Sequence, residues 1–441
     1  MTLLARKLQT VDYFTLSFGT MVGVGWLVVM DDWLSRGGPL GGILGFALGG
    51  AMLAPIGYVY GRLAMAMPDA ASEIAYTGAV FPEAVSFFTG WMMVLAYGIV
   101  CPWEAVAIGK IAAYLVPALD RIELYRVGGI PVYLPHLLVG LALVALITRL
   151  NWRGIRLSAT LQNWMTFGLL GLYVLFGSFG LARGSKANLR PLFSHRGWVS
   201  VLLVLQIVPY FMTGFEAVPK CAEEAAPAFR SRGFFRAILL AIAVGAAFYT
   251  SVIALVAYVG HWQTLAHENF ATAAAFERAL GSRWIVSVIF AAALLSLVKV
   301  FNGNFVAASR LIFALGRRGM LAGRLGAVNQ RTRTPAAAIL AVGAVTAAAV
   351  LLGEAVLVPI TEVGSLASAA GWLATCAAYA VMRPGKGPTA LAATGALVAL
   401  ALVLMKLVPA VPGHFTGVEF LVLGLWILAG LLLRRRGVRR T

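Results

Sequence analysis

Apolar runs of about 20 residues recur from one end of this chain to the other, and they limit the folds open to it. A helix of that length crosses the hydrocarbon core of a bilayer. Of the 441 residues, 61% are hydrophobic and 12% are charged, which leaves no stretch for a soluble domain. The sequence therefore predicts an all-α membrane protein. We place twelve spans at about 12–31, 39–66, 84–117, 132–149, 156–182, 198–226, 233–259, 283–316, 335–353, 356–381, 388–407 and 417–433.

The positive charge is distributed unevenly over the loops. The formal net charge is +18, and with the N-terminus inside, the cytoplasmic segments hold about 23 Lys and Arg and the outer segments about 11. This bias favours a multi-pass protein of the cell (inner) membrane with both termini cytoplasmic, including Lys386 and a basic 434–440 tail. Nucleic acid is therefore not an expected partner. One outer loop goes against the bias, with Arg183, Lys186, Arg190 and Arg196.

The first span carries glycines where an uninterrupted helix should run. Arg6 and Lys7 precede it, and because no small-residue cleavage site follows, we expect a span and not a removable signal peptide. Gly19, Gly23 and Gly25 each cost about 1 kcal/mol relative to alanine in a helix interior. The helix is expected to open there, and open backbone in a bilayer is tolerated only inside protein or around a cavity. Close helix packing by small residues is the alternative.

The sixth span is interrupted in the same way, by Pro209, Gly214 and Pro219, with Glu216 just after the glycine. Interrupted spans that open two blocks of five are typical of an inverted repeat with a binding site near the midplane. We therefore divide the chain into a first repeat at 1–182, a second repeat at 183–386, and two further spans at 387–441.

Two ionisable residues lie deep inside predicted spans, Glu104 in the third and Lys299 in the eighth. A charge near the bilayer centre costs at least ~2.5 kcal/mol on insertion scales, so each needs a partner in the bundle or must lose its charge. Glu104 has two explanations, a structural carboxylate bonded to a neighbouring helix, which we favour, and a role in proton coupling. Lys299 shares a helix face with Asn302 and is too far from either end of its span to reach the surface easily.

No pattern in the sequence indicates enzymatic chemistry. No nucleophile with its base is visible, so we expect no enzyme, no cofactor and no metal. A channel would need a continuous pore lined by polar rings, whereas this chain has isolated polar groups beside helix breaks. The cysteines and histidines share no metal-ligand or redox spacing. These residues are Cys101, Cys221, Cys376, His136, His195, His261, His267 and His414.

Three stretches together carry a resemblance to a known family. They are Gly23-Val-Gly-Trp26 in the first span, Gly214-Phe-Glu-Ala-Val218 with Ala222-Glu-Glu224 in the sixth, and Asn302 to Arg310 in the eighth, followed by a Gly-Arg loop and Arg333-Thr-Pro335. Over nearly its whole length the chain resembles bacterial members of the amino acid-polyamine-organocation (APC) family of permeases. This resemblance implies a LeuT-like five-plus-five inverted repeat with discontinuous helices 1 and 6 and two additional C-terminal helices.

The resemblance also implies a substrate site at the two breaks. The substrate carboxylate would lie on the amides of Val24, Gly25 and Trp26, as anions do at helix N-termini. The substrate amine would be held by carbonyls at the ends of the first half-helices, those of Met21 and Val22 and of Tyr210 and Thr213. Gly23 and Gly214 would also belong to the substrate site. Side-chain selectivity would come from Tyr97, Cys101, Phe211, Phe215, Asn302 and Asn304. Phe215 or Trp26 would be an aromatic lid, and ordinary packing is the alternative for each aromatic residue.

Lys299 departs from the usual pattern of the family. Many relatives have a small hydroxyl residue there, which in sodium-driven members of the wider fold helps to bind the coupling sodium. We expect the Lys299 ammonium to replace that sodium, contacting the carbonyls of Gly19 and Val22, so that transport is sodium-independent. Proton coupling through Lys299, with Glu104 or Glu216, is a further and weaker hypothesis.

The expected function is therefore that of a secondary active transporter for amino acids. Neutral L-amino acids are the first choice, taken up by exchange or with protons, because Glu104 and Glu216 are the only acidic residues expected near the site. Cationic amino acids or amines such as polyamines or ethanolamine come next, although a carboxylate-free amine would leave the amides of Val24 to Trp26 without their anion. A transporter-like nutrient sensor is the alternative from another class.

Overall fold

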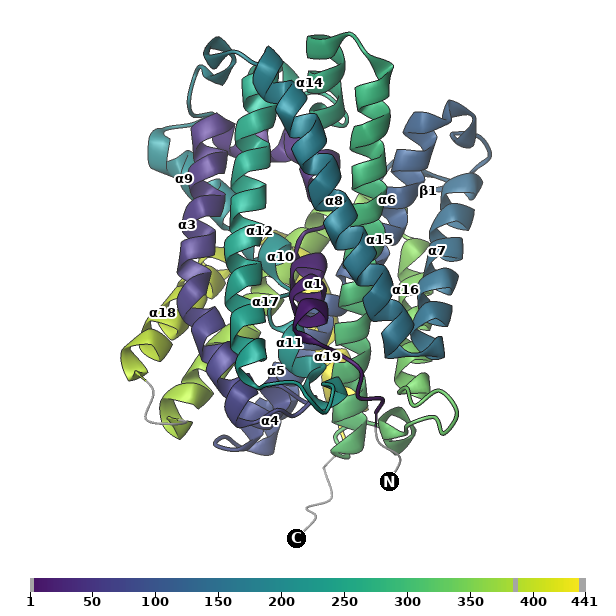
Figure 1. Cartoon of the computed structure of the whole chain (residues 1–441), viewed down its shortest axis with the longest axis vertical. Helices are drawn as coiled ribbons and strands as arrows, with labels where there is room; N and C mark the ends of the chain where they lie inside the picture. Colours follow the sequence, from purple (N-terminus) through teal and green to yellow (C-terminus); the bar gives the residue numbers. More distant parts are fainter. Residues whose placement is uncertain (1–3, 384–387, 436–441) are drawn as a thin grey trace.

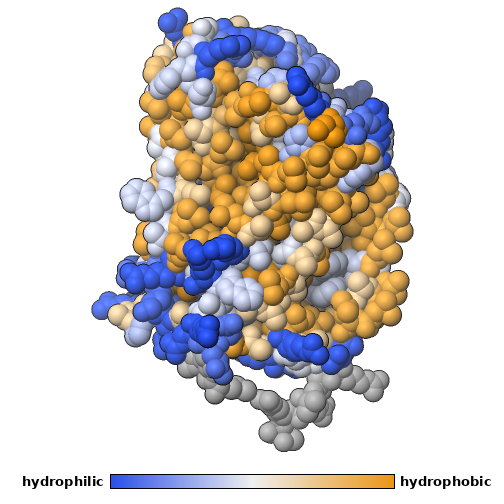
Figure 2. All heavy atoms as spheres, turned by 90° about the vertical axis from the view of Figure 1, so that its right-hand side faces the viewer, coloured by the Kyte–Doolittle hydropathy of each residue, from blue (hydrophilic) through white to orange (hydrophobic). Residues whose placement is uncertain are grey.

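The computed structural model describes residues 4–383 and 388–435, which form a bundle of helices (Figure 1). Figure 2 shows a broad hydrophobic band across one face, with hydrophilic side chains gathered at its two ends. Large apolar side chains lie on the surface, and Trp164, Trp198 and Leu432 are 77%, 72% and 76% exposed. Such a surface suits lipid and not water. The predicted all-α membrane protein is confirmed.

The helices follow each other with short connections. In chain order they and the two strands are α1 (Thr10–Met21), α2 (Gly25–Val28), α3 (Met30–Ala66), α4 (Glu73–Gly78), α5 (Glu83–Gly98), α6 (Val100–Leu115), β1 (Glu123–Val127), β2 (Ile130–Tyr133), α7 (Leu134–Arg153), α8 (Ile155–Arg183), α9 (Gly197–Leu205), α10 (Val208–Met212), α11 (Ala217–Lys220), α12 (Arg232–Val259), α13 (Trp262–Leu265), α14 (Ala271–Leu280), α15 (Arg283–Arg317), α16 (Ala336–Val350), α17 (Leu357–Met382), α18 (Thr389–Leu407) and α19 (Gly417–Leu433). A 3-10 turn, η3 (Ala222–Glu224), follows α11.

Helical segments lie at each of the twelve predicted positions. Within the described residues, nine segments are long and apolar enough to cross a bilayer, and α16 and α19 are shorter apolar helices. The sixth predicted span is divided into α9, α10 and α11. The total of twelve crossings stays a prediction. Lys386 and the basic residues after Arg435 lie outside the described residues.

Both predicted interruptions are present. The first helix ends at Met21 and resumes at Gly25, and Val22 between them has extended backbone angles. The sixth span is broken between Met212 and Ala217. Glycine and proline weaken a helix because they cost backbone entropy and hydrogen bonds, which is why these two spans open.

Three features differ from the predictions. After the first break α2 is followed, past a non-helical Val29, by a helix that continues to Gly37 and not to residue 31, and an ion pair of 2.8 Å joins Asp32 to Arg36 one turn apart. The chain then bends at Gly38, whose φ of 62° is in the left-handed region. The β1–β2 hairpin and the short helices α13 and α14 join spans and were not predicted, because only apolar runs of membrane length were sought.

Small residues let α3 approach its neighbours closely. A Cβ atom added at Gly45 would lie 2.6 Å from Val204, and one at Gly57 would lie 2.3 Å from Ile242. Glycine at these positions allows α3 to pack against α9 and α12. The second predicted span is therefore a packing helix.

One end of the bundle is held by buried and half-buried ion pairs. Arg310 of α15 lies 2.9 Å from Glu224 of η3, and both side chains are buried. The Glu224 carbonyl accepts hydrogen bonds from the backbone of Lys7 and Leu8. Burial acts to raise the pKa of neighbouring Glu223, but its hydrogen bonds and ion pair with Arg317 outweigh this and lower that pKa. The start of the chain is thus joined to the end of the sixth span.

The contact between α1 and α15 gives a test of the packing. A Cβ atom at Gly303 would lie 2.1 Å from the Thr20 hydroxyl and 3.0 Å from its Cα. We expect Gly303→Ala to destabilise the protein by about 1–3 kcal/mol, because the backbone of α1 has to move. Thermal unfolding in detergent measures this effect. The control is Gly171→Ala in α8, where nothing lies within 4 Å of the added methyl group. Equal unfolding temperatures for the two variants would contradict the close approach.

Candidate functional site

The breaks of the first and sixth spans lie against each other in the middle of the bundle. Gly214 has a φ of 141°, and a Cβ atom there would lie 2.6 Å from the Met21 backbone nitrogen. A Cβ atom at Gly25 would lie 2.5 Å from the ring of Phe211. Because these contacts leave no room for side chains, each glycine is required by the approach of the other span.

Cationic and hydroxyl groups of α15 bind the carbonyls that the first break exposes. Lys299 donates to the carbonyl of Gly19 at 3.5 Å and to the carbonyl of Val22. Ser296, one turn away, donates to the carbonyls of Val22 at 3.1 Å and Gly23 at 2.7 Å. Both side chains are fully buried. The predicted contacts of Lys299 are therefore present, and the role of Lys299 in coupling stays a prediction.

Two further side chains complete the support of the opened backbone. The Tyr249 hydroxyl of α12 accepts from the Gly23 amide at 3.2 Å and donates to the Met21 carbonyl at 3.1 Å. Asn304 of α15 donates to the Thr20 carbonyl at 3.0 Å. Tyr249 therefore bridges the two edges of the break.

Glu104 of α6 lies directly against the break. A Cβ atom at Gly23 would lie 2.9 Å from its Oε1 atom. Glu104 is 3% exposed, its Oε2 atom has no hydrogen-bond partner in the described structure, and Lys299 acts on it electrostatically. Whether Glu104 is structural or takes part in proton coupling stays a prediction.

The sixth-span break is bound by α17. The Tyr210 amide donates to Ser365 at 3.2 Å, and the Thr213 hydroxyl is hydrogen-bonded to Ser368. Phe211 packs edge-on against Trp33, with ring centroids 4.8 Å apart. The aromatic rings of Phe211 and Trp33 therefore pack over one side of the two breaks.

A second buried charged cluster lies below the sixth-span break. Lys220 of α11 lies 2.6 Å from Glu73 of α4 and 4.7 Å from the ring centre of Tyr97. Glu216 accepts hydrogen bonds from the Gly214 amide and the Trp372 indole, both at 3.0 Å. Sequence analysis did not identify the Glu73–Lys220 pair. The sequence gives little indication of this pair, because Glu73 and Lys220 lie in polar segments near span ends, where charged residues are usually exposed to water.

Two predicted site residues, Asn302 and Trp26, contact neighbouring helices instead of the two breaks. Asn302 exchanges hydrogen bonds of 3.0 Å with Asn151, Ser158 and Gln162, and so joins α15 to α7 and α8. Trp26 stacks on Phe176 of α8. The remaining predicted residues are buried at the level of the breaks or beside the Lys220 cluster. They are Cys101, which neighbours Glu104, and Phe215, which packs on Tyr60 and Trp372.

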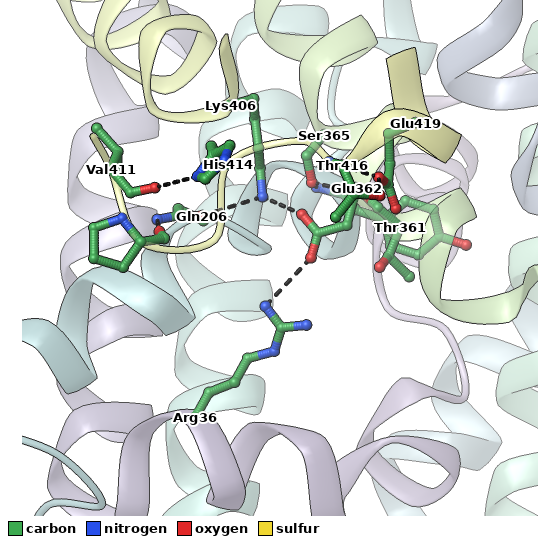
Figure 3. A network of polar contacts seen from close by, with 12 residues as sticks. Arg36, Gln206, Thr361, Glu362, Ser365, Lys406, Val411, His414, Thr416 and Glu419 are labelled. Carbon is green, nitrogen blue, oxygen red and sulfur yellow. Dashed lines mark hydrogen bonds and ion pairs between the residues drawn. The ribbon is translucent and has the colours of Figure 1, made fainter. Parts of the chain in front are cut away.

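A third polar network joins the starts of α3 and α17 to the end of α18 (Figure 3). Arg36 lies 3.2 Å from Glu362, and Lys406 contacts Glu362 from the other side. Gln206 lies 3.4 Å from Lys406. The sequence contained a signal for this network, because Glu362 and Lys406 are charged residues inside predicted spans. A charged residue inside an apolar span drew attention to Lys299 and Glu104, and the same pattern at Glu362 and Lys406 predicts a buried network as well.

The site at the breaks is closed in this structure. Every predicted substrate or coupling residue is buried, and Tyr210 is 7% exposed. An apolar groove of about 920 Å³ lies elsewhere, between α5, α15, α16 and α19, and no predicted site residue lines it. Among the described residues, no group of three or more His, Cys, Asp or Glu side chains could hold a metal ion.

Comparisons with known proteins agree on one family. The family model described as "Amino acid permease" matches residues 8–432. The chain is 26% identical to the branched-chain amino acid permease BcaP of Bacillus subtilis, over 98% of this chain and 92% of that protein. It is 23% identical to an aspartate-proton symporter of the same organism, over 76% and 65% of the two chains. It is 24% identical to the vacuolar cationic amino acid transporter 4 of Arabidopsis thaliana, over 82% and 61%.

The bridge formed by Tyr249 can be tested by removing one oxygen atom. We expect Tyr249→Phe to destabilise the protein by about 1–3 kcal/mol, because a buried amide and a buried carbonyl lose their partner while the ring keeps its packing. Thermal unfolding of the purified protein measures this loss. Tyr114→Phe, which alters a tyrosine that is 39% exposed, is the control. If both variants unfold at the temperature of the parent protein, the opened backbone does not depend on Tyr249.

Proposed function

Because the chain belongs to the amino acid permease family, we propose that it is a secondary active transporter of neutral L-amino acids that works without sodium. The observation that carries this proposal is the meeting of two opened spans, held by a buried ammonium group. Backbone amides and carbonyls that are freed in the middle of a membrane bind the charged ends of a zwitterion. The protein would lie in the cell membrane with both termini cytoplasmic, as the distribution of Lys and Arg favours.

The proposed architecture is a five-plus-five inverted repeat with two further helices. Its halves are spans 1–5 and 6–10, each opening with an interrupted span. The contact of Gly214 with Met21 supports this arrangement, because it brings the two interruptions to one place. Alternating access would then move one set of helices against the other around the site.

The substrate would bind at the groups that the breaks still offer. Its carboxylate would accept from the amides of Val24 to Trp26, and its amine would donate to carbonyls at the ends of α1 and α10. The Met21 carbonyl accepts one hydrogen bond, from Tyr249, and keeps a second lone pair for the amine, whereas the Val22 carbonyl already accepts from both Lys299 and Ser296. Tyr210 and Phe211 would contact the side chain of the substrate.

Lys299 would take the place of a coupling sodium ion. Its ammonium contacts the carbonyls of Gly19 and Val22, and Ser296 adds a hydroxyl beside it. A cation on a covalent stem braces the opened helix whether or not sodium is present. Transport would therefore depend on exchange or on protons, and one relative is named an aspartate-proton symporter.

A cationic amino acid or an amine is the second candidate substrate. The observation that favours it is the unpartnered Oε2 atom of Glu104, which would attract an additional positive charge. The relatives include both a branched-chain and a cationic amino acid transporter. Family membership therefore does not decide between a neutral and a cationic substrate. A transporter-like nutrient sensor would bind the same ligands with little flux.

Sodium dependence can be tested with the purified protein. A thermal-shift screen against the common amino acids and amines first identifies a ligand, because ligands stabilise by mass action. We expect uptake of that ligand into proteoliposomes to be the same with sodium or potassium outside. Counterflow should exceed net uptake for an exchanger, whereas a sensor would show little of either. Strict dependence on a sodium gradient would refute the replacement of sodium by Lys299.

The role of Lys299 itself can be tested by substitution. We expect Lys299→Ala to reduce uptake about tenfold or more, because hydrogen bonds to charged groups contribute about 1.5–3 kcal/mol each. Lys299→Met keeps the aliphatic packing near Phe18 and should show the same loss in a folded protein. Lys110→Ala, which removes a half-buried lysine paired with Glu354 at 3.7 Å, is the control. Unaltered uptake by folded Lys299→Met would contradict the proposal.

A further inference from the structure

The end of α7 carries arginines that no carboxylate of the described residues neutralises. Arg149 and Arg153 are four residues apart, so they lie one turn apart on one face of the helix. Both are exposed, and neither has a side-chain hydrogen bond or an ion pair within residues 4–383 and 388–435. The chain has no Asp or Glu at 124–215 or at 278–353, the stretches that contain α7, α8 and α16. This positive charge is therefore open to an anion from outside the protein.

A groove runs from these arginines along the contact between α7 and α16, and we call it the α7–α16 groove. Its volume is about 750 Å³. Its apolar walls include Leu141, Val144, Ala145, Leu340, Ala344 and Ala347. The Thr148 hydroxyl also lines it, but that hydroxyl donates to the Val144 carbonyl at 2.7 Å. Gly343 brings the two helices together, because a Cβ atom there would lie 2.6 Å from the Thr148 hydroxyl. Small residues thus form the floor of a groove that is open on its outer side.

The loop before α16 adds positive charge at the same end of the groove. The Thr334 hydroxyl donates to the Trp152 carbonyl at 3.3 Å, which joins this loop to the end of α7. Arg331 and Arg333 of the loop are exposed. The end of α7 and the start of α16 lie toward the N-terminus of the chain (Figure 1), and on that side of the molecule hydrophilic side chains gather below a hydrophobic face (Figure 2). In the proposed orientation this end faces the cytoplasm, where the membrane leaflet contains anionic lipids.

The charge and the groove together fit one class of ligand. Arginine binds phosphate oxygens through its fork of N–H donors. Trp152, which lines the groove between the two arginines, is of a residue type that is enriched at the level of lipid headgroups. The remainder of the groove is apolar and favours hydrocarbon. A ligand that suits both parts has a phosphate at one end and an acyl chain at the other.

We propose that the α7–α16 groove is a binding site for an anionic phospholipid. Its phosphate binds Arg149 and Arg153, and one of its acyl chains lies along the groove. The bound lipid holds α7 against α16 at the point where Asn151 of α7 donates to Asn302 of α15 at 3.0 Å. This inference does not depend on the proposed transport of amino acids, and its test requires no substrate.

The test is native mass spectrometry of the purified, delipidated full chain, titrated with phosphatidylglycerol and with phosphatidylcholine of the same acyl chains. We expect one phosphatidylglycerol to bind more tightly than phosphatidylcholine, because the two lipids differ in net charge and not in their chains. Arg149→Gln combined with Arg153→Gln should weaken the binding of phosphatidylglycerol up to about 30-fold, since each arginine beside an anionic lipid changes the affinity about fivefold. Equal binding of the two lipids by the parent protein would contradict the site.

The control removes equal charge at the opposite end of the bundle. Arg183→Gln combined with Arg190→Gln alters two exposed arginines, at the end of α8 and in the loop that follows. This double variant should bind phosphatidylglycerol as the parent protein does. An equal loss of affinity in the two double variants would show a general attraction between charges and would overturn the site.

A second substitution blocks the groove and leaves its arginines in place. Ala344 is an exposed residue of the groove wall, so a phenylalanine fits there without a change of fold. We expect Ala344→Phe to weaken the binding of phosphatidylglycerol, whereas Ala393→Phe, at an exposed alanine of α18 outside the groove, should not. Unaltered binding by folded Ala344→Phe would contradict an acyl chain in the groove.

The source of the phosphate is tested with glycerophosphoglycerol, the same headgroup without its acyl chains. It should compete only weakly with phosphatidylglycerol, because the burial of each CH₂ group contributes about 0.8 kcal/mol, or about fourfold in affinity. Competition as strong as that of the intact lipid would show that the ligand is a soluble phosphate compound, and it would overturn the assignment to a phospholipid.

Discussion

The structure depends on satisfying the backbone groups that the first span leaves open inside the membrane. An unsatisfied amide or carbonyl in a bilayer costs several kcal/mol, so a break persists only where other side chains take over the lost hydrogen bonds. Two helices contribute these hydrogen bonds here, α15 with Lys299 and Ser296 and α12 with Tyr249, and Glu104 of α6 lies against Gly23 on a third side. The surrounding bundle is arranged so that these helices reach one short segment.

The buried charges differ in how they are paired. Glu73 and Lys220 neutralise each other directly, as do Arg310 and Glu224. Direct pairs of this kind hold helices together and have little charge left for a ligand. Lys299 instead donates to carbonyls of the break, and Glu104 lies against Gly23, with its Oε2 atom unpartnered in the described structure.

Sequence patterns predicted the spans and their interruptions well, because apolar length and glycine or proline content determine both. The contacts of Lys299 with Gly19 and Val22 were also predicted, from the likeness to a family and the need of a buried ammonium for partners. Tyr249 and Ser296 could not be predicted, because single polar residues in apolar spans are usual in packing. Asn302 shows the opposite case, since a polar residue near the site in sequence is bonded to α7 and α8.

The contact between Gly214 and Met21 has a mechanical consequence. With 2.6 Å between the Met21 nitrogen and the place of a Gly214 Cβ atom, the two backbones leave no room for a side chain between them. A tilt of the first half of either interrupted span therefore pushes directly on the other. The two interrupted spans are therefore expected to move together and not independently.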